Sequence, residues 1–111
     1  MSADYIVIAG QRYRVEVNWN AIVAFLEDRG TDRLDALAEL GKISVKDIAP
    51  LMAACIREGE RLDGRECTLT ALELGALPGF MDVIPMFLRI YGRQAAPGTG
   101  EAPKEEPGKK E

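Results

Sequence analysis

Apolar residues at the start of the chain predict a β-hairpin over residues 4–17. The run YIVIA is followed by Gly10 and Gln11, and then by RYRVEV, in which apolar and charged residues alternate. This two-residue period is typical of a strand, and Gly10 with Gln11 supplies a tight turn. The first run does not alternate, which indicates a strand covered on both faces. Because an isolated hairpin is barely stable in water, we expect it to lie on helices or to pair with another chain.

Helical spacing of apolar residues begins directly after the hairpin. A helix over about 19–29 has asparagines available to cap its start, and Gly30 stands where the helix should end. A second, short helix is expected from Thr31 to Gly41. We interpret the single tryptophan, Trp19, as a core residue or as a contact between the hairpin and the first helix.

The segment SVKD offers two possible starts for the next helix, Ser44 and Asp47. A helix capped by Ser44 would carry Pro50 in its second turn, where the ring costs a backbone hydrogen bond. A helix capped by Asp47 would carry it in the first turn, where the missing N–H costs little. We therefore predict a regular helix over about 48–58.

The mixed-charge stretch REGERLDGREC is expected to form a solvated loop. Its arginines recur every four residues, but acidic residues stand among them, which does not favour a phosphate-binding face. After it, Thr68 is expected to cap a brief helix, LTALEL, that ends at Gly75.

The last apolar segment, GFMDVIPMFLRIYG, predicts a helix whose apolar arc is unusually wide. At roughly 100° per residue the arc covers about 220°, around twice what a helix resting on one core surface needs. Pro85 fits if the helix begins near Asp82, and otherwise kinks it. Two interpretations stay open. Either the helix is central and covered all round, or one margin, Met81 on one side or Met86 with Ile90 on the other, is exposed and binds a partner.

Length and composition favour one small domain. The 111 residues, 47% of them apolar, suffice for a single modest core, so we predict an α+β, mostly α domain at 1–93: an N-terminal hairpin followed by a bundle of four to five short helices. Residues 94–111 are rich in Pro, Glu, Lys and Gly, which predicts a disordered tail.

Charge and residue usage exclude several classes of function. A net charge of −4 and a pI near 4.9 argue against nucleic-acid binding. The chain has no histidine and only two cysteines, so we expect no catalytic residues, no metal and no cofactor. The start of the chain contains no signal-like or membrane-spanning run, and we expect a cytoplasmic protein without a membrane role.

The order of these elements, with three short phrases, resembles the tail assembly chaperones of long-tailed bacteriophages, including the group with a gene transfer agent tail protein. The phrases are V-x-V-N-W-N-A-I-x-A-F-L-E after the hairpin, S-x-x-D-I, and T-L-x-A-L-E-L, and the resemblance covers roughly residues 5–93. It implies a non-enzymatic protein of the bacterial host cytoplasm that binds the tape measure protein and itself while the tail tube polymerises. The alternative is a small acidic regulatory or adaptor protein that acts by protein–protein binding.

The resemblance also bears on the tail. In many such phages a ribosomal frameshift near the end of the chaperone gene gives a longer product whose second domain recruits the tail tube protein. Residues 94–111 have the composition of a flexible linker to such a domain, and equally of a plain solubilising extension.

The two interpretations of the tail predict different genes. If the frameshift occurs here, the codons for Gly108, Lys109 and Lys110 form a slippery run such as G-GGA-AAA or A-AAA-AAG, and the minus-one frame stays open well beyond Glu111. Sequencing the gene checks this prediction. A broken run such as GGC-AAG-AAG, or an early stop in that frame, would leave the tail as a solubilising extension.

Overall fold

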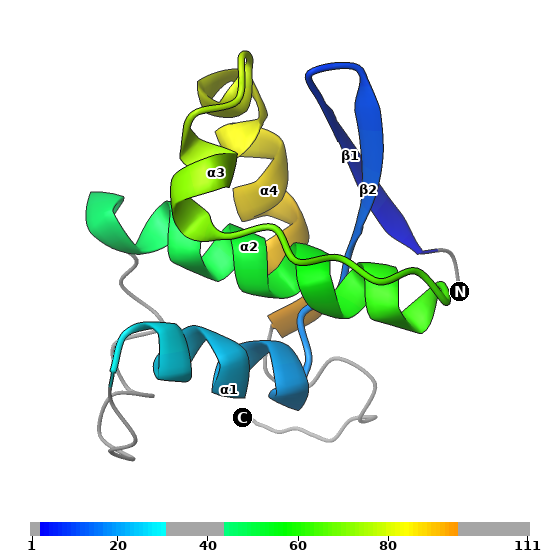
Figure 1. The fold of residues 1–111 in the computed structure, drawn as a ribbon, viewed down its shortest axis with the longest axis vertical. Coiled ribbons are helices and arrows are strands. Elements are labelled where there is room, and N and C mark those ends of the chain that lie inside the picture. Colours follow the sequence, from blue (N-terminus) through cyan, green and yellow to red (C-terminus); the bar gives the residue numbers. More distant parts are fainter. Residues whose placement is uncertain (1–2, 31–43, 96–111) are drawn as a thin grey trace, which may run out of the picture.

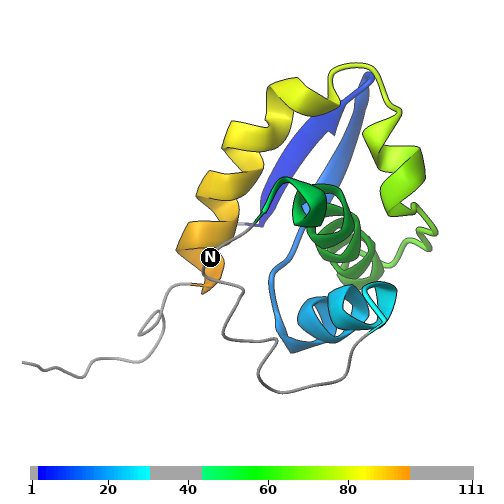
Figure 2. The ribbon, with the colours of Figure 1, turned by 90° about the vertical axis from the view of Figure 1, so that its left-hand side faces the viewer.

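The longest helix, α2, lies at the centre of the computed structural model, which describes residues 3–30 and 44–95. Strand β2, helix α1 and the short helix α3 pack against α2, while α4 packs against strand β1. The hairpin therefore lies between α2 and α4, as Figures 1 and 2 show from two directions. The elements in chain order are β1 (Asp4–Ile8), β2 (Gln11–Val15), α1 (Trp19–Asp28), α2 (Val45–Leu62), α3 (Ala71–Gly75) and α4 (Phe80–Ala95).

This architecture confirms the predicted α+β class. A two-stranded antiparallel hairpin at the N-terminus is followed, in the described ranges, by four helices. The short helix expected between Thr31 and Gly41 falls outside the described residues, as does the tail from residue 96 onward.

The hairpin turn consists of Ala9 and Gly10, because Ile8 pairs with Gln11 across the two strands. Both turn residues have positive φ angles, 53° and 80°, as a type I′ turn requires. The predicted turn at Gly10 and Gln11 is therefore wrong by one residue. Glycine adopts this backbone freely, whereas an alanine there costs about 1 kcal/mol. The turn is thus not the feature that holds the hairpin together.

The two faces of the hairpin differ in burial. Ile6, Ile8 and Val15 are buried in the core, while Val7 points the other way and is 57% exposed. The expectation that the first strand is covered on both faces is therefore wrong. Its run of apolar residues failed to alternate because one apolar side chain faces solvent.

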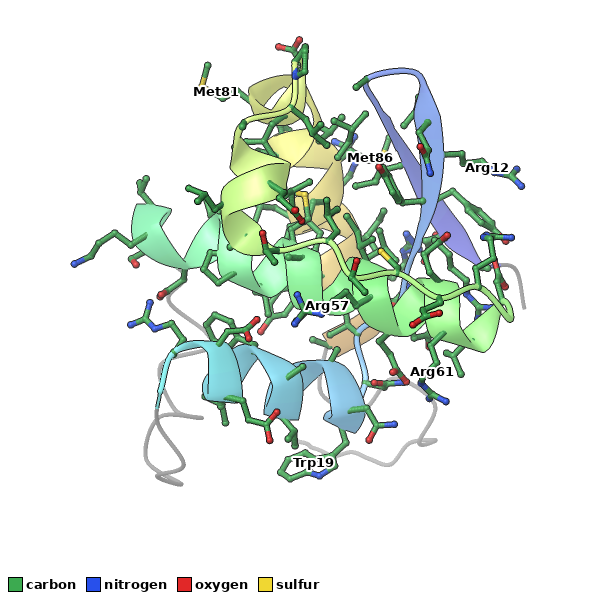
Figure 3. The ribbon with its side chains drawn as sticks, viewed as in Figure 1. Arg12, Trp19, Arg57, Arg61, Met81 and Met86 are labelled. Atoms are coloured by element: carbon green, nitrogen blue, oxygen red, sulfur yellow. The ribbon has the colours of Figure 1, made fainter. Side chains whose placement is uncertain are left out.

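Helix α1 matches its prediction in extent but not in the placement of its tryptophan. Asn18 caps the helix, accepting a hydrogen bond from the N–H of Ala21 at 3.0 Å, and Ala21 and Phe25 are buried on the side that faces α2. Trp19 is 64% exposed and points away from the core in Figure 3. Its interpretation as a core residue or interelement contact is therefore wrong.

Helix α2 begins at Val45 after Ser44, not near residue 48 as predicted. Pro50 is the sixth residue of the helix and removes one hydrogen bond, the one to the carbonyl of Lys46. Lys46 is exposed, so that carbonyl can be hydrated, and this lowers the cost below what the prediction assumed. Asp47 also stabilises the first turn, since it accepts a hydrogen bond from the Ser44 hydroxyl and forms an ion pair with Arg29, the residue that follows α1.

The predicted loop after residue 58 is wrong in its first part, because α2 continues to Leu62. The charged residues there were interpreted as solvated, but Glu58 and Glu60 are 7% and 4% exposed. Helix α3 starts at Ala71, capped by Thr70 and not by Thr68. Thr70 has a glutamate three residues on, and the two complete a capping box that Thr68 could not form.

Helix α2 passes directly against strand β2 at Gly59. A Cβ atom added at Gly59 would overlap the carbonyl group of Arg14, so only glycine allows this approach. On either side of the contact the N–H of Arg14 donates to the Glu60 carboxylate at 2.8 Å and the N–H of Glu16 donates to the Cys55 carbonyl at 3.1 Å. The helix thereby accepts two N–H groups along the outer edge of β2 and just beyond its end.

We expect Gly59→Ala to lower the free energy of unfolding by about 2 kcal/mol or more, because the strand must move to admit the methyl group. Gly92→Ala in α4 is the matched control. A Cβ there meets nothing within 4 Å, and alanine is the better helix former, so this variant should be stabilised by up to about 1 kcal/mol. Urea denaturation of the two variants measures both effects, and equal stabilities would contradict the close approach.

Candidate partner-binding surface

Helix α4 attaches to the domain through one face. Phe87 and Ile90 are buried at 0% and 2% exposure, and the neighbouring side chains Phe80, Val83, Ile84 and Tyr91 are partly buried against the same core. At the end of the helix, Gln94 donates to the Val15 carbonyl and to Asp4, and it accepts from the N–H of Val17 at 2.6 Å. The apolar arc is thus only partly used by the core.

A second side of α4, next to its buried face, carries apolar residues in solvent. Met81 and Leu88 are 79% and 38% exposed, and Pro85 between them is exposed as well. Because helix positions three, four and seven apart share a face, these three residues form one line along the outside of the helix. We name Met81, Pro85 and Leu88 the α4 stripe.

The predicted partner-binding residues divide between the two faces. Met81 is exposed, as Figure 3 shows at the start of α4, and Met86 is 44% exposed, with its sulfur 3.8 Å from an Arg89 nitrogen. Ile90 lies in the core, so an exposed margin formed by Met86 with Ile90 is wrong. Leu88, which the sequence analysis did not select, is exposed on the surface, whereas Ile90 is not.

Pro85 lies inside α4, on this exposed side of the helix. It is the sixth residue of α4 and cannot donate the hydrogen bond that would reach the Met81 carbonyl. The helix begins at Phe80, earlier than the start near Asp82 that would place Pro85 in the first turn. The unpaired carbonyl belongs to the exposed Met81, so water can satisfy it.

A second distinctive region is the cluster of buried carboxylates at the end of α2. The Glu58 carboxylate accepts two hydrogen bonds from Arg61, at 2.9 and 2.7 Å, and one from Asn18 at 2.8 Å. The side chain of Asn20 donates to it as well, at 3.4 Å. The Arg61 hydrogen bonds chiefly lower the pKa of Glu58 from 4.5 to about 2. This carboxylate therefore ties α1 to α2 in its charged form.

Glu60 has the same role between α2 and the hairpin. It accepts from the main chain of Arg14 and, at 2.8 Å, from the Nε of Arg65. The contact with Arg65 is the main reason that its pKa lies below the ordinary value. The acids and arginines of this stretch are therefore partners of one another, in place of the solvated loop that was expected.

A groove of about 310 Å³ lies beside this cluster, lined by residues that include Asn20, Arg57, Arg61, Arg65 and Cys67. Its arginines are engaged within the protein. Arg57 donates to the Leu69 carbonyl and to Asp28, each at 2.9 Å, and the other two pair with Glu58 and Glu60. An anion would have to displace these partners, so the groove is a weak candidate for ligand binding.

The described residues offer little that could act as a nucleophile or hold a metal ion. The thiol of Cys55 is buried, which raises its pKa to about 12 and keeps it protonated at neutral pH. Residues 3–30 and 44–95 contain no group of three or more acidic or cysteine side chains placed to hold a metal ion. None of the described helices has the length and apolarity to cross a membrane.

Comparisons with known proteins identify no relative of this chain. No family model matches the chain, and neither a curated protein nor a solved structure matches it.

The buried carboxylate of Glu58 predicts a specific loss of stability in acid. A pKa lowered from 4.5 to about 2 stabilises the fold above pH 4.5, and the contribution disappears as the pH falls toward 2. Glu58→Gln should lower the free energy of unfolding at pH 7 by about 2 kcal/mol and reduce its dependence on pH below 4.5. The exposed Glu27 provides a control, Glu27→Gln. Thermal unfolding between pH 2 and 7 measures the difference, and parallel curves for both variants would contradict the assigned role.

Proposed function

We propose that the chain is a tail assembly chaperone of a phage or prophage, and that it binds the tape measure protein through the α4 stripe. The observation that carries the proposal is the line of exposed apolar residues Met81, Pro85 and Leu88 on a helix that is anchored by its other face. The sequence phrases shared with this family support it. The proposed activity is non-enzymatic and takes place in the cytoplasm of the bacterial host.

The chemistry of the stripe suits a long, apolar-rich partner. Methionine is flexible and polarizable, so it adapts to irregular surfaces and to a series of similar sites along one chain. A helix in a partner that repeats apolar residues at helical spacing could lie along the stripe. The net charge of −4 keeps the chaperone itself in solution while this surface is open.

The remaining parts of the proposal concern the other partners. The family resemblance favours self-association, and a longer, frameshifted product would bring in the tail tube protein.

The stripe can be tested by placing charge on it. Met81→Glu with Leu88→Glu should leave the fold unchanged, because both side chains are exposed, and should weaken binding to the tape measure protein of the same phage or prophage by about tenfold or more. Leu72→Glu on α3 is the control, since Leu72 is 86% exposed and lies off the stripe. Circular dichroism checks the fold, and calorimetric titration of the purified proteins measures binding.

The outcomes separate the candidate functions. Loss of binding in the double variant but not in the control supports the chaperone assignment and the stripe. Equal binding by all three proteins would place the interaction elsewhere on the chain. No binding by the unaltered chain would favour the small regulatory or adaptor class.

A further inference from the structure

Arg89 has neither a carboxylate nor an aromatic partner in the part of the chain that the structure describes. Its guanidinium has one polar contact there, to the sulfur of Met86 at 3.8 Å. Every other described arginine has one partner or the other. Arg12 lies over the ring of Tyr5, 4.3 Å from its centre. The rest pair with acidic side chains, and they are Arg14, Arg29, Arg57, Arg61, Arg65 and Arg93.

The charge of Arg89 is not used by its own helix either. The residues three and four positions away are Pro85, Met86, Gly92 and Arg93, and none of them is acidic, so no ion pair along the helix is available. Arg89 also lies in the middle of α4, whereas a cation stabilises the helix dipole in the last turn, where Arg93 is placed. The cation is therefore available to a bound partner.

Exposed apolar side chains lie next to Arg89 on the surface of α4. Pro85 of the α4 stripe is four residues before it and Met86 is three before it, so the three residues are neighbours on the helix. Side chains of a helix lean toward its N-terminus, and the contact with the Met86 sulfur has this direction. Figure 3 shows Met86 on the side of α4 toward the hairpin. The guanidinium thus lies beside the stripe, over the turn that carries Pro85 and Met86.

We propose that the partner of the α4 stripe is an amphipathic helix that places a carboxylate, from Asp or Glu, against Arg89. The inference rests on the proposed function, because it concerns the same surface, and it adds the charge that the partner must carry. An apolar line on the partner packs on Met81, Pro85 and Leu88. The acid lies at the border of that line.

Charge complementarity is the argument for this occupant. A helix that covers the stripe also removes water from Arg89, and a guanidinium that loses its hydration without gaining an acid opposes binding. A carboxylate reverses this effect, because it can accept two parallel hydrogen bonds from the planar guanidinium. Arginine is accordingly enriched among the residues that dominate the energy of interfaces. An apolar helix with no acid, or with a basic residue at this position, is therefore rejected.

The remainder of the protein does not favour acidic partners in general. The net charge of −4 repels a negatively charged segment at long range. Asp82 is seven residues before Arg89 and so lies on the same side of α4, where it repels an acid placed two turns away from the first. The partner is thus an apolar helix with one acid at a defined position, and not an acidic segment as a whole.

Substitution of Arg89 provides the first test, with the full chain and the tape measure protein of the same phage or prophage. Arg89→Gln should leave the fold unchanged, because the side chain is exposed, and should weaken binding in calorimetric titration by about tenfold or more. Arg12→Gln is the matched control, since it removes the same charge from an exposed position on the hairpin. It should bind like the unaltered chain, and equal binding by the two variants would overturn the proposal.

A library of synthetic amphipathic helices provides the second test and does not depend on the tape measure protein. The peptides share one apolar line, vary at the positions that border it, and are selected on the immobilised full chain. Selected peptides should carry Asp or Glu at one bordering position, and its replacement by Asn or Gln should weaken binding by about tenfold or more. Selection on Arg89→Gln should show no such preference, which assigns the effect to this pair.

The two tests separate this inference from the proposed function. Tape measure binding that Arg89→Gln does not change overturns the inference and leaves the function standing. An acidic preference in the library, with no tape measure binding by the unaltered chain, supports the inference and overturns the function. Selected peptides without an acidic preference, or no selected peptide at all, overturn the inference. A second copy as the occupant, detected by sedimentation as an oligomer that Arg89→Gln dissociates, would also overturn it.

Discussion

The contact between Gly59 and strand β2 is the constraint on which the arrangement of the other elements depends. It lets α2 come close enough for Glu60 and the Cys55 carbonyl to accept the outward N–H groups of the strand. A two-stranded hairpin has too few internal bonds to stand alone, and here a helix accepts two of the N–H groups at one of its edges. Since α4 packs against β1, the position of α4 depends in turn on the same contact.

Buried charge has an unusual share in holding this small domain together. Glu58 and Glu60 are nearly inaccessible, yet each is surrounded by donors from a second element, Asn18 in one case and the main chain of Arg14 in the other. Such carboxylates fix the relative orientation of the elements they join, because their oxygens accept hydrogen bonds only from particular directions. The apolar core around α2 supplies cohesion, and the two glutamates set how α1 and the hairpin lie against it.

The sequence predicted the elements of this fold better than their ends and their surfaces. Periodicity located the hairpin and the helices because it records which side chains are apolar. It could not show that Glu58 and Glu60 are buried, since their partners are distant in the chain, and the end of α2 was therefore misplaced. It also could not separate Ile90 from Met86 on the wide arc of α4, because only the position of β1 decides which margin is covered. Trp19 was misplaced for the same reason: its side chain is apolar enough for a core, and only the direction of α1 turns it outward.

The separation of the hairpin from its helical cover has a consequence for synthesis of the chain. The strands leave the ribosome first, but Glu60, which caps the edge of β2, lies 46 residues after Arg14. Until α2 emerges, the nascent hairpin has a strained Ala9 turn and two open edges. Contacts so distant in sequence form late because closing the intervening chain costs entropy. The N-terminal segment is therefore made early and becomes stable only when more than half of the protein has been translated.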